Sequence, residues 1–233
     1  MFIIASSLMN IGLLVVINYG NFFNTLKEEL SPTDVYYMMP EALYTDEVDS
    51  YIDENEHIEK VQKNDVLWIG ADILSKGKEQ PYTILFSNMD EEREVSKWKY
   101  VGEHLPAEEM SVYIPDVFKA VSGYQLNDKI DLKYIEEDTG ENKTLSFTVR
   151  GYTEDIFFSS TDTGCMGFYL TDETYNKVED ILSNPKYHAK VVFIDVDELK
   201  NIKVVESGIR EILNLNSASM MSGDISTMFI AID

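Results

Sequence analysis

The sequence predicts an α+β fold that follows an N-terminal transmembrane and stalk helix. Residues 1–20 contain no charged side chain, whereas the 233-residue chain as a whole is strongly acidic. Two units that each combine strands with a helix lie far apart, within residues 31–105 and 166–222, and a β-rich stretch separates them. We therefore expect one α+β lobe made of two sequence halves, with a small β-rich lobe inserted at residues 106–165.

The opening run, MFIIASSLMNIGLLVVINYG, is predicted to form a transmembrane helix. Twenty residues rising about 1.5 Å each span about 30 Å, the thickness of a bilayer's hydrocarbon core. A secretory signal peptide fits less well, because no Lys or Arg precedes Lys27 and no small-residue cleavage motif follows the apolar run. A buried helix of a soluble protein is the remaining alternative.

The helix is predicted to continue past Gly20 as a stalk and to end at Ser31 and Pro32. Charged residues 27–29 occupy one side of this stalk, and an apolar stripe occupies the other. The stripe provides the candidate stalk-coupling residues: Phe22, Phe23, Leu26 and Leu30. A solvated stalk without a coupling role is the alternative. Membrane helix and stalk together cover residues 1–30.

The first half of the α+β lobe, residues 31–105, reads as β-α-β-β. Residues 34–40, DVYYMMP, predict a strand that ends at Pro40. Thr45 followed by acidic residues predicts the start of a helix that runs to about Asn55. Residues 58–74 and 81–88 are predicted strands joined by the turn SKGKEQ.

The second half, residues 166–222, contains a similar strand and helix. The apolar run KVVFIDV at 190–196 predicts a buried strand. One face of a following helix is predicted from the spacing of Ile202, Val205, Ile209, Ile212 and Leu213. The two halves together are similar to a split ferredoxin-like sandwich. Two unrelated strand-helix pairs are the alternative.

The intervening stretch, residues 106–165, has a different texture. MSVYIPDVFKAVSG predicts a short strand, a proline turn and a short helix that ends at Gly123. The segments DKIDLKYIEED and NKTLSFTVRGYTED then alternate apolar and polar residues around the turn DTGEN, which predicts a hairpin. This stretch is the predicted β-rich inserted lobe.

Composition restricts the partners of the chain. Its 42 Asp and Glu residues against 19 Lys and Arg residues give a net charge of −23. Nucleic acid is excluded as a partner, because binding it requires a basic surface. The negative field instead favours cationic ligands such as cationic peptides. The one cysteine, Cys165, excludes an intrachain disulfide and is predicted to be a buried, inert thiol.

The motifs of catalysis and metal binding are missing from the sequence. The nearest string to a nucleotide-binding loop, GADILSKGKEQ, has the wrong spacing. His57, His104 and His188 lie far apart and outside zinc-binding motifs, and the acidic strings DVDEL and EEDTGEN lack the ordered ligands of a calcium loop. We therefore expect no catalytic residue, no cofactor and no metal, and we expect the chain not to be an enzyme.

Two aromatic pairs are candidate contacts for a ligand or partner. Phe157 and Phe158 precede a Ser/Thr/Gly-rich link at which a hinge or cleft is expected. Core packing is their alternative role. Trp98 and Tyr100 lie beside a local basic cluster, which is typical of an edge that faces a membrane or a partner. An ordinary exposed strand is the alternative there.

The segment MSVYIPDVFKAVSGYQLNDKIDLKYI, followed by LSFTVRGYTED, resembles a segment of MacB/FtsX-type ABC transporter permeases. In these permeases a short helix leads through a Gly and an Asn-Asp turn into a hairpin that ends in V-x-G. The matching positions here are Gly123, Asn127, Asp128, Ile130, Leu132, Val149 and Gly151. Residues 168–182 and 190–213 resemble the family's next strand-helix pairs, and residues 223–233 resemble the start of a second transmembrane segment.

The resemblance implies an extracytoplasmic domain held at the cell membrane. Such a domain contacts a substrate or partner outside the cell, does no covalent chemistry and is moved by a separate cytoplasmic ABC ATPase. Export or sensing of an antimicrobial peptide, a lipid or a lipoprotein, and a homodimeric assembly, are further expectations. The alternative is a single-span, membrane-anchored extracellular binding module without an ATPase.

Overall fold

The computed structural model describes residues 25, 28–159, 165–214 and 220–224 of the chain. The predicted membrane helix and most of the predicted second membrane segment therefore lie outside the described residues, as do Phe22, Phe23 and Leu26. Within the described part, no helix has the length and apolar character needed to cross a membrane.

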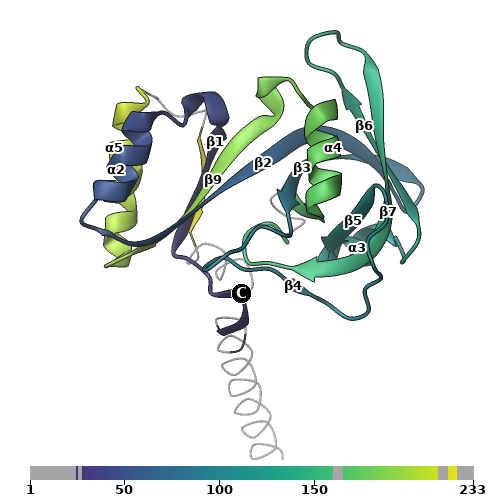
Figure 1. Cartoon of the computed structure of the whole chain (residues 1–233), viewed down its shortest axis with the longest axis horizontal. Helices are drawn as coiled ribbons and strands as arrows, with labels where there is room; N and C mark the ends of the chain where they lie inside the picture. Colours follow the sequence, from purple (N-terminus) through teal and green to yellow (C-terminus); the bar gives the residue numbers. More distant parts are fainter. Residues whose placement is uncertain (1–24, 26–27, 160–164, 215–219, 225–233) are drawn as a thin grey trace, which may run out of the picture.

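A single mixed sheet organises the described residues (Figure 1). Its strand order is β10-β1-β9-β2-β3-β8-β5-β7-β4, and β6 pairs with both β2 and β7. The strands are β1 (Val35–Pro40), β2 (Ile58–Ser75), β3 (Lys78–Asn88), β4 (Lys99–Tyr100), β5 (Ser111–Pro115), β6 (Lys129–Ile135), β7 (Asn142–Glu154), β8 (Cys165–Leu170), β9 (His188–Val196) and β10 (Met221–Asp224). The predicted mixture of helices and strands is thus confirmed, and its strands form one large sheet.

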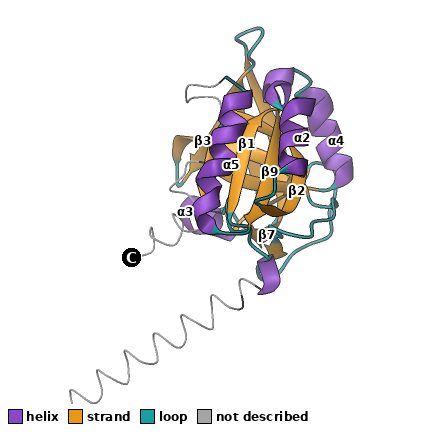
Figure 2. Cartoon of the chain, turned by 90° about the vertical axis from the view of Figure 1, so that its left-hand side faces the viewer, coloured by secondary structure: helices purple, strands orange, loops and turns teal. Residues whose placement is uncertain are grey.

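The helices cover the sheet in two groups. The α-helices are α2 (Asp46–Glu54), α3 (Asp116–Ser122), α4 (Asp172–Ile181) and α5 (Ile202–Ile212), and short 3₁₀ turns occur at Glu41–Leu43, Pro185–Tyr187 and Leu199–Asn201. Helices α2 and α5 lie side by side over β1 and β9 (Figure 2), whereas α3 and α4 lie toward the other end of the sheet. The predicted N-cap of α2 is confirmed, because Thr45 Oγ1 accepts a hydrogen bond from the Val48 N–H at 3.4 Å.

Three apolar clusters form the core. The first lies between α2, α5 and one face of β1 and β9, and the second lies on the opposite face of these strands. The third and largest fills the curled part of the sheet beneath α3 and α4. The long strand β2 runs through the whole arrangement, because it pairs with β9 along its first part and with β3 along its second.

The two strand-helix units that are distant in sequence do come together. Strand β1 pairs with β9, and α2 packs beside α5. The sheet nevertheless runs without a break into the strands of 106–165, and β8 and α4 pack in the largest cluster with those strands. A ferredoxin-like sandwich and the lobe boundaries at 105 and 165 stay predictions.

Two predicted boundaries differ from the structure. The turn predicted over SKGKEQ is shorter, because β3 already begins at Lys78 and only Lys76 and Gly77 form the hairpin loop. Both residues have positive φ angles, 46° and 81°, as a tight primed turn requires. Residues 223 and 224, predicted to begin a membrane segment, instead lie at the end of β10.

Candidate functional site at the base of the leading helix

The helix that leads into the domain ends at a junction in which several hydrogen bonds hold its last residues. Residues 28–30 are helical, and Ser31 ends the helix with a left-handed backbone, φ 43°. The last carbonyl groups of a helix have no partner within it. Here the N–H of Lys97 donates to the Leu30 carbonyl, and the N–H of Ser96 donates to the Ser31 carbonyl, both at 2.7 Å. Residues 93–100, which we name the clamp segment, therefore hold the helix end.

Side chains reinforce the same junction. Thr33 Oγ1 and Ser96 Oγ are hydrogen-bonded at 2.9 Å, and both residues are buried. The Lys99 ammonium contacts the Glu29 carboxylate and lies 3.4 Å from a carboxylate oxygen of Glu154 at the end of β7. The Glu29 contact is the main reason that the pKa of Lys99 is raised. Charge, hydroxyl and backbone contacts thus converge on one helix end.

Of the candidate stalk-coupling residues, Leu30 lies in this junction. Its side chain is fully buried, 0% exposed, although it belongs to the last turn of a helix that arrives from outside the sheet. A helix that merely stood in solvent would have no reason to bury its final apolar residue. The described end of the stalk is therefore packed into the domain.

The junction also continues directly into the other end of the sheet. After Ser31 only three residues precede β1. The N–H of Asp34 donates to Asp195 Oδ1 at 3.2 Å, and Asp34 Oδ2 accepts from the Val196 N–H at 3.0 Å, which ties this link to the end of β9. The helix end is thus attached to β1 and β9 on one side and, through the clamp segment, to β7 on the other.

Trp98 and Tyr100 belong to the clamp segment and are half-buried. The Trp98 ring lies 5.2 Å from the ring of Tyr169 on β8 and 5.0 Å from the ring of Tyr100, measured between centroids. Tyr100 in turn stacks on His104 at 3.8 Å, and burial raises its pKa to about 12. These aromatic contacts join the clamp segment to the middle of the sheet. Contact of this pair with a ligand or partner stays a prediction.

Phe157 and Phe158 occupy a different place from that expected of ligand contacts. They are 2% and 5% exposed, and their rings pack on Tyr36 at centroid distances of 4.9 and 5.0 Å. Both also face Phe193 of β9. In this structure they are core residues, the role that was their alternative interpretation, and neither presents a surface to a ligand.

A buried polar cluster that sequence reasoning missed joins Arg93, at the start of the clamp segment, to the core. The Asp155 carboxylate accepts hydrogen bonds from the Phe158 N–H at 2.5 Å and from the Tyr169 hydroxyl at 3.1 Å. The Arg93 guanidinium lies over the ring of Tyr169, 5.6 Å from its centre, and over the ring of Phe193 at 5.8 Å. The sequence feature that could have indicated this cluster is Arg93, a single arginine inside the acidic run DEEREV.

Asp155 should make stability depend on pH in a distinctive direction. Burial raises the pKa of this carboxyl above its usual range, although Arg93 and the Phe158 N–H act in the opposite sense. The folded state then binds the proton more tightly than the unfolded state, so the stabilisation from this group is largest in acid and is lost as pH rises through the folded pKa. Asparagine has no such titration. We expect Asp155→Asn to gain stability relative to wild type from about pH 4 upward.

Urea unfolding of both proteins at a series of pH values measures this difference, in which the other carboxylates cancel. A difference that does not change with pH, or that favours wild type as pH rises, would contradict the expectation. The second result would mean that the positive charge of Arg93 outweighs burial at this carboxyl.

The other chemical groups are placed as follows. Cys165 is buried as predicted, and burial beside Asp155 raises the pKa of its thiol to about 12. Across the described ranges, His, Cys, Asp and Glu side chains form no group of three that is able to hold a metal ion.

The last described strand, β10, brings the chain back to the place where it enters the sheet. Strand β10 pairs antiparallel with β1, and Asp224 is the cross-strand partner of Val35. The last described residue therefore lies beside the first residue of the sheet, next to the junction.

Comparisons with known proteins give matches among solved structures alone. No family model matches the sequence, and no curated protein matches it significantly. Solved structures do match. The periplasmic region of MacB from Actinobacillus actinomycetemcomitans has 12% identity and a TM-score of 0.40, over 89% of this chain and 97% of that one.

Two further solved structures are of the same kind. The extracellular domain of the noncanonic ABC-type transporter YknZ from Gram-positive bacteria has 12% identity and a TM-score of 0.39, over 82% of this chain and 100% of that one. A domain of a putative permease protein from Porphyromonas gingivalis has 11% identity and a TM-score of 0.35, over 81% and 85%. Because these values are low, the function below rests on the residues of this chain.

Proposed function

We propose that the chain is the extracytoplasmic domain of a MacB/FtsX-type ABC transporter permease, held at the cell membrane and coupled mechanically to a separate cytoplasmic ABC ATPase. The observation that carries the proposal is the junction, where the helix end is bonded to the clamp segment beside β7 and the link that follows it is bonded to β9. A displacement of the helix must then act on the whole sheet, because packed elements move as units.

The domain's part in this cycle is to contact a substrate or partner and to move. Residues 1–20 and the chain from residue 225 onward supply the membrane segments of the proposal, and the adjacent positions of Val35 and Asp224 suit a chain that leaves and rejoins one membrane. The acidity of the chain favours a cationic peptide over other cargo. A lipid-linked substrate and a homodimer are the further expectations of the resemblance.

The test uses the full-length gene product in lipid nanodiscs with the ATPase that co-purifies with it. Glu47 on α2 and Glu103 beyond β4 are exposed and lie toward opposite ends of the sheet. Cysteines at these two positions, in a Cys165→Ala background, carry spin labels for distance measurement. We expect the distance of each label from a third label on the ATPase to change when ATP is trapped.

Loosening the junction should abolish this change. Thr33→Val with Lys99→Ala removes the hydroxyl contact to Ser96 and both ion pairs of Lys99. Lys186→Ala is the matched control, because it removes an exposed ion pair with Glu137, 3.6 Å long, at the end of β9 opposite to the junction. Nucleotide-independent distances in wild type would refute mechanical coupling. Purification without any ATPase would favour the anchored binding module instead.

A further inference from the structure

Strand pairing in the sheet is interrupted between β2 and the hairpin formed by β6 and β7. Strand β9 pairs with β2 only as far as Leu67, and β6 pairs with β2 only at Asp72 and Ile73. On that side, residues 68–71 of β2 have no strand partner among the described residues. Strand β6 also departs from β2 after Lys133, although it stays paired with β7 to Ile135. Among the described residues, each of these two strand edges therefore lacks a strand partner on this side.

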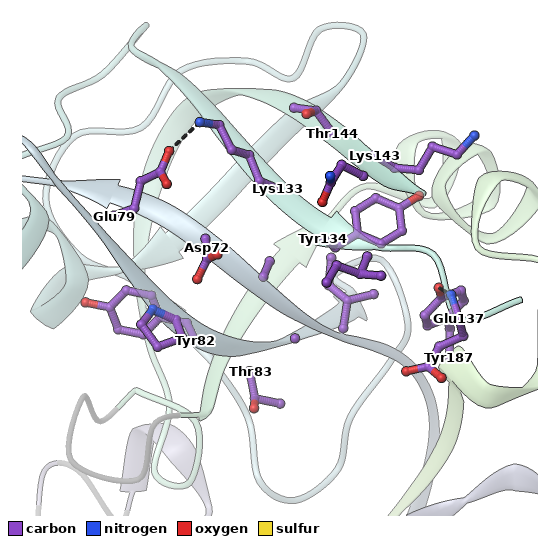
Figure 3. A pocket seen from close by; sticks show the side chains of 16 residues that line it. Asp72, Glu79, Tyr82, Thr83, Lys133, Tyr134, Glu137, Lys143, Thr144 and Tyr187 are labelled. Carbon is purple, nitrogen blue, oxygen red and sulfur yellow. Dashed lines mark hydrogen bonds and ion pairs between the residues drawn. The ribbon is translucent and has the colours of Figure 1, made fainter. Parts of the chain in front are cut away.

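A groove of about 610 Å³ lies over this interruption and over the adjoining pair of β2 and β3, which contributes Pro81, Tyr82 and Thr83 to its lining (Figure 3). Its floor includes Gly70, which has no atom within 4 Å of the position that a Cβ would take. The volume lies within the range of ligand sites, roughly 300–1,000 Å³. Tyr134 and Tyr187 stand at one end of the groove, and Glu79 and Lys133 form an ion pair at the other.

The charges around the groove favour a cationic occupant. Each nearby lysine is already neutralised: Lys133 by Glu79, Lys143 by Glu141 at 2.9 Å, and Lys186 by Glu137 at 3.6 Å. Asp72, in the middle of the groove, makes no hydrogen bond or ion pair with any described residue. Asp72 is the cross-strand partner of Lys133 on β6 and attracts its ammonium, so this carboxylate stands at the end of the interruption where β2 and β6 meet.

Exposed apolar side chains flank the same face. Ile135 lines the groove and is 64% exposed, and Leu74 on the neighbouring part of β2 is 55% exposed. An extended segment with alternating basic and aliphatic side chains matches this surface, because its backbone pairs with open edges while its side chains meet carboxylate and apolar groups.

We propose that this groove binds an extended, lysine-bearing peptide segment by strand addition to β2, with Asp72 as the partner of a basic side chain. The inference adds a ligand class and its location to the proposed function. The peptide-binding test uses the chain without the ATPase. A negative result there would not contradict mechanical coupling, and a negative result in the coupling experiment would not contradict peptide binding.

The probe is a fluorescein-labelled peptide of alternating lysine and valine, titrated with the full-length chain in neutral detergent while fluorescence anisotropy is measured. We expect saturable binding at low salt that Asp72→Lys weakens about tenfold. Gly70→Val should also abolish it by filling the groove floor. Glu211→Lys on α5, an equal change of charge at an exposed site remote from the groove, should alter affinity less than about twofold.

A second peptide separates strand addition from simple charge attraction. N-methylation of its valines retains every charge and side chain but removes backbone N–H donors, and we expect it to bind at least about tenfold more weakly. Equal affinity of the two peptides would overturn the proposal, and so would equal weakening by Asp72→Lys and Glu211→Lys. Circular dichroism melts of all variants show whether each one is folded.

Discussion

Arg93→Met is expected to lower the free energy of unfolding by about 3 kcal/mol, because it removes a buried charge that neighbours another. Arg93 is 9% exposed, and its guanidinium covers the rings of Tyr169 and Phe193. Methionine retains the length and apolar packing of the stem, so the loss reports the guanidinium. It also leaves the buried Asp155 carboxylate without its nearest source of positive charge.

Chemical denaturation measures this loss, and a double-mutant cycle assigns it. Lys60→Met is the control, since its exposed ion pair should contribute less than about 1 kcal/mol. Combining Arg93→Met with Asp155→Asn should cost less than the sum of the single changes, because the neutral side chain no longer needs a cation. Strict additivity would show that the two groups do not interact.

Gly151→Ala is expected to destabilise the protein by about 1–3 kcal/mol through overpacking. A Cβ at this position of β7 would lie 2.7 Å from Cδ1 of Tyr113 and 2.9 Å from Cβ of His104. The Tyr113 ring has little freedom to retreat, because it is 3% exposed and its hydroxyl donates to the Leu105 carbonyl at 3.0 Å. This contact gives a physical reason for a glycine at the end of the V-x-G motif.

Gly70→Ala is the matched control, since it also adds one methyl group to a strand but in open space. Its unfolding midpoint in urea should equal or exceed that of wild type, because alanine loses less backbone entropy than glycine on folding. Equal midpoints for Gly151→Ala and Gly70→Ala would contradict the crowding seen at Tyr113.

The elements that sequence reasoning predicted well carry their signal locally. Val205 and Ile209 on the predicted face of α5 are fully buried, and the alternation in the β6–β7 hairpin matches cross-strand neighbours such as Ile130 and Phe147. In both cases the spacing of apolar residues along the chain indicates which face of the helix or strand is buried. The N-cap of α2 was predictable for the same reason, because capping depends on residues a few positions apart.

The junction could not be predicted in this way. Ser96 and Lys97 hold the helix end through backbone N–H groups, which every residue except proline has, across more than 60 positions of sequence. Such bonds leave no periodic pattern. The groove was hidden for a related reason, since it results from where two strand pairings stop and not from any residue type. Burial of Phe157 and Phe158 likewise depends on contacts with Tyr36 and Phe193, distant in the chain.

The pairing of β1 with β10 has a consequence for how the domain responds to force. Because Val35 and Asp224 are cross-strand partners, sliding the chain before the sheet lengthwise past the chain that follows it would shear several ladder hydrogen bonds at once. Tilting both together breaks none. We therefore expect the domain to resist sliding of one chain end past the other more strongly than a tilt of both ends together, in which the two ends would move as one lever arm.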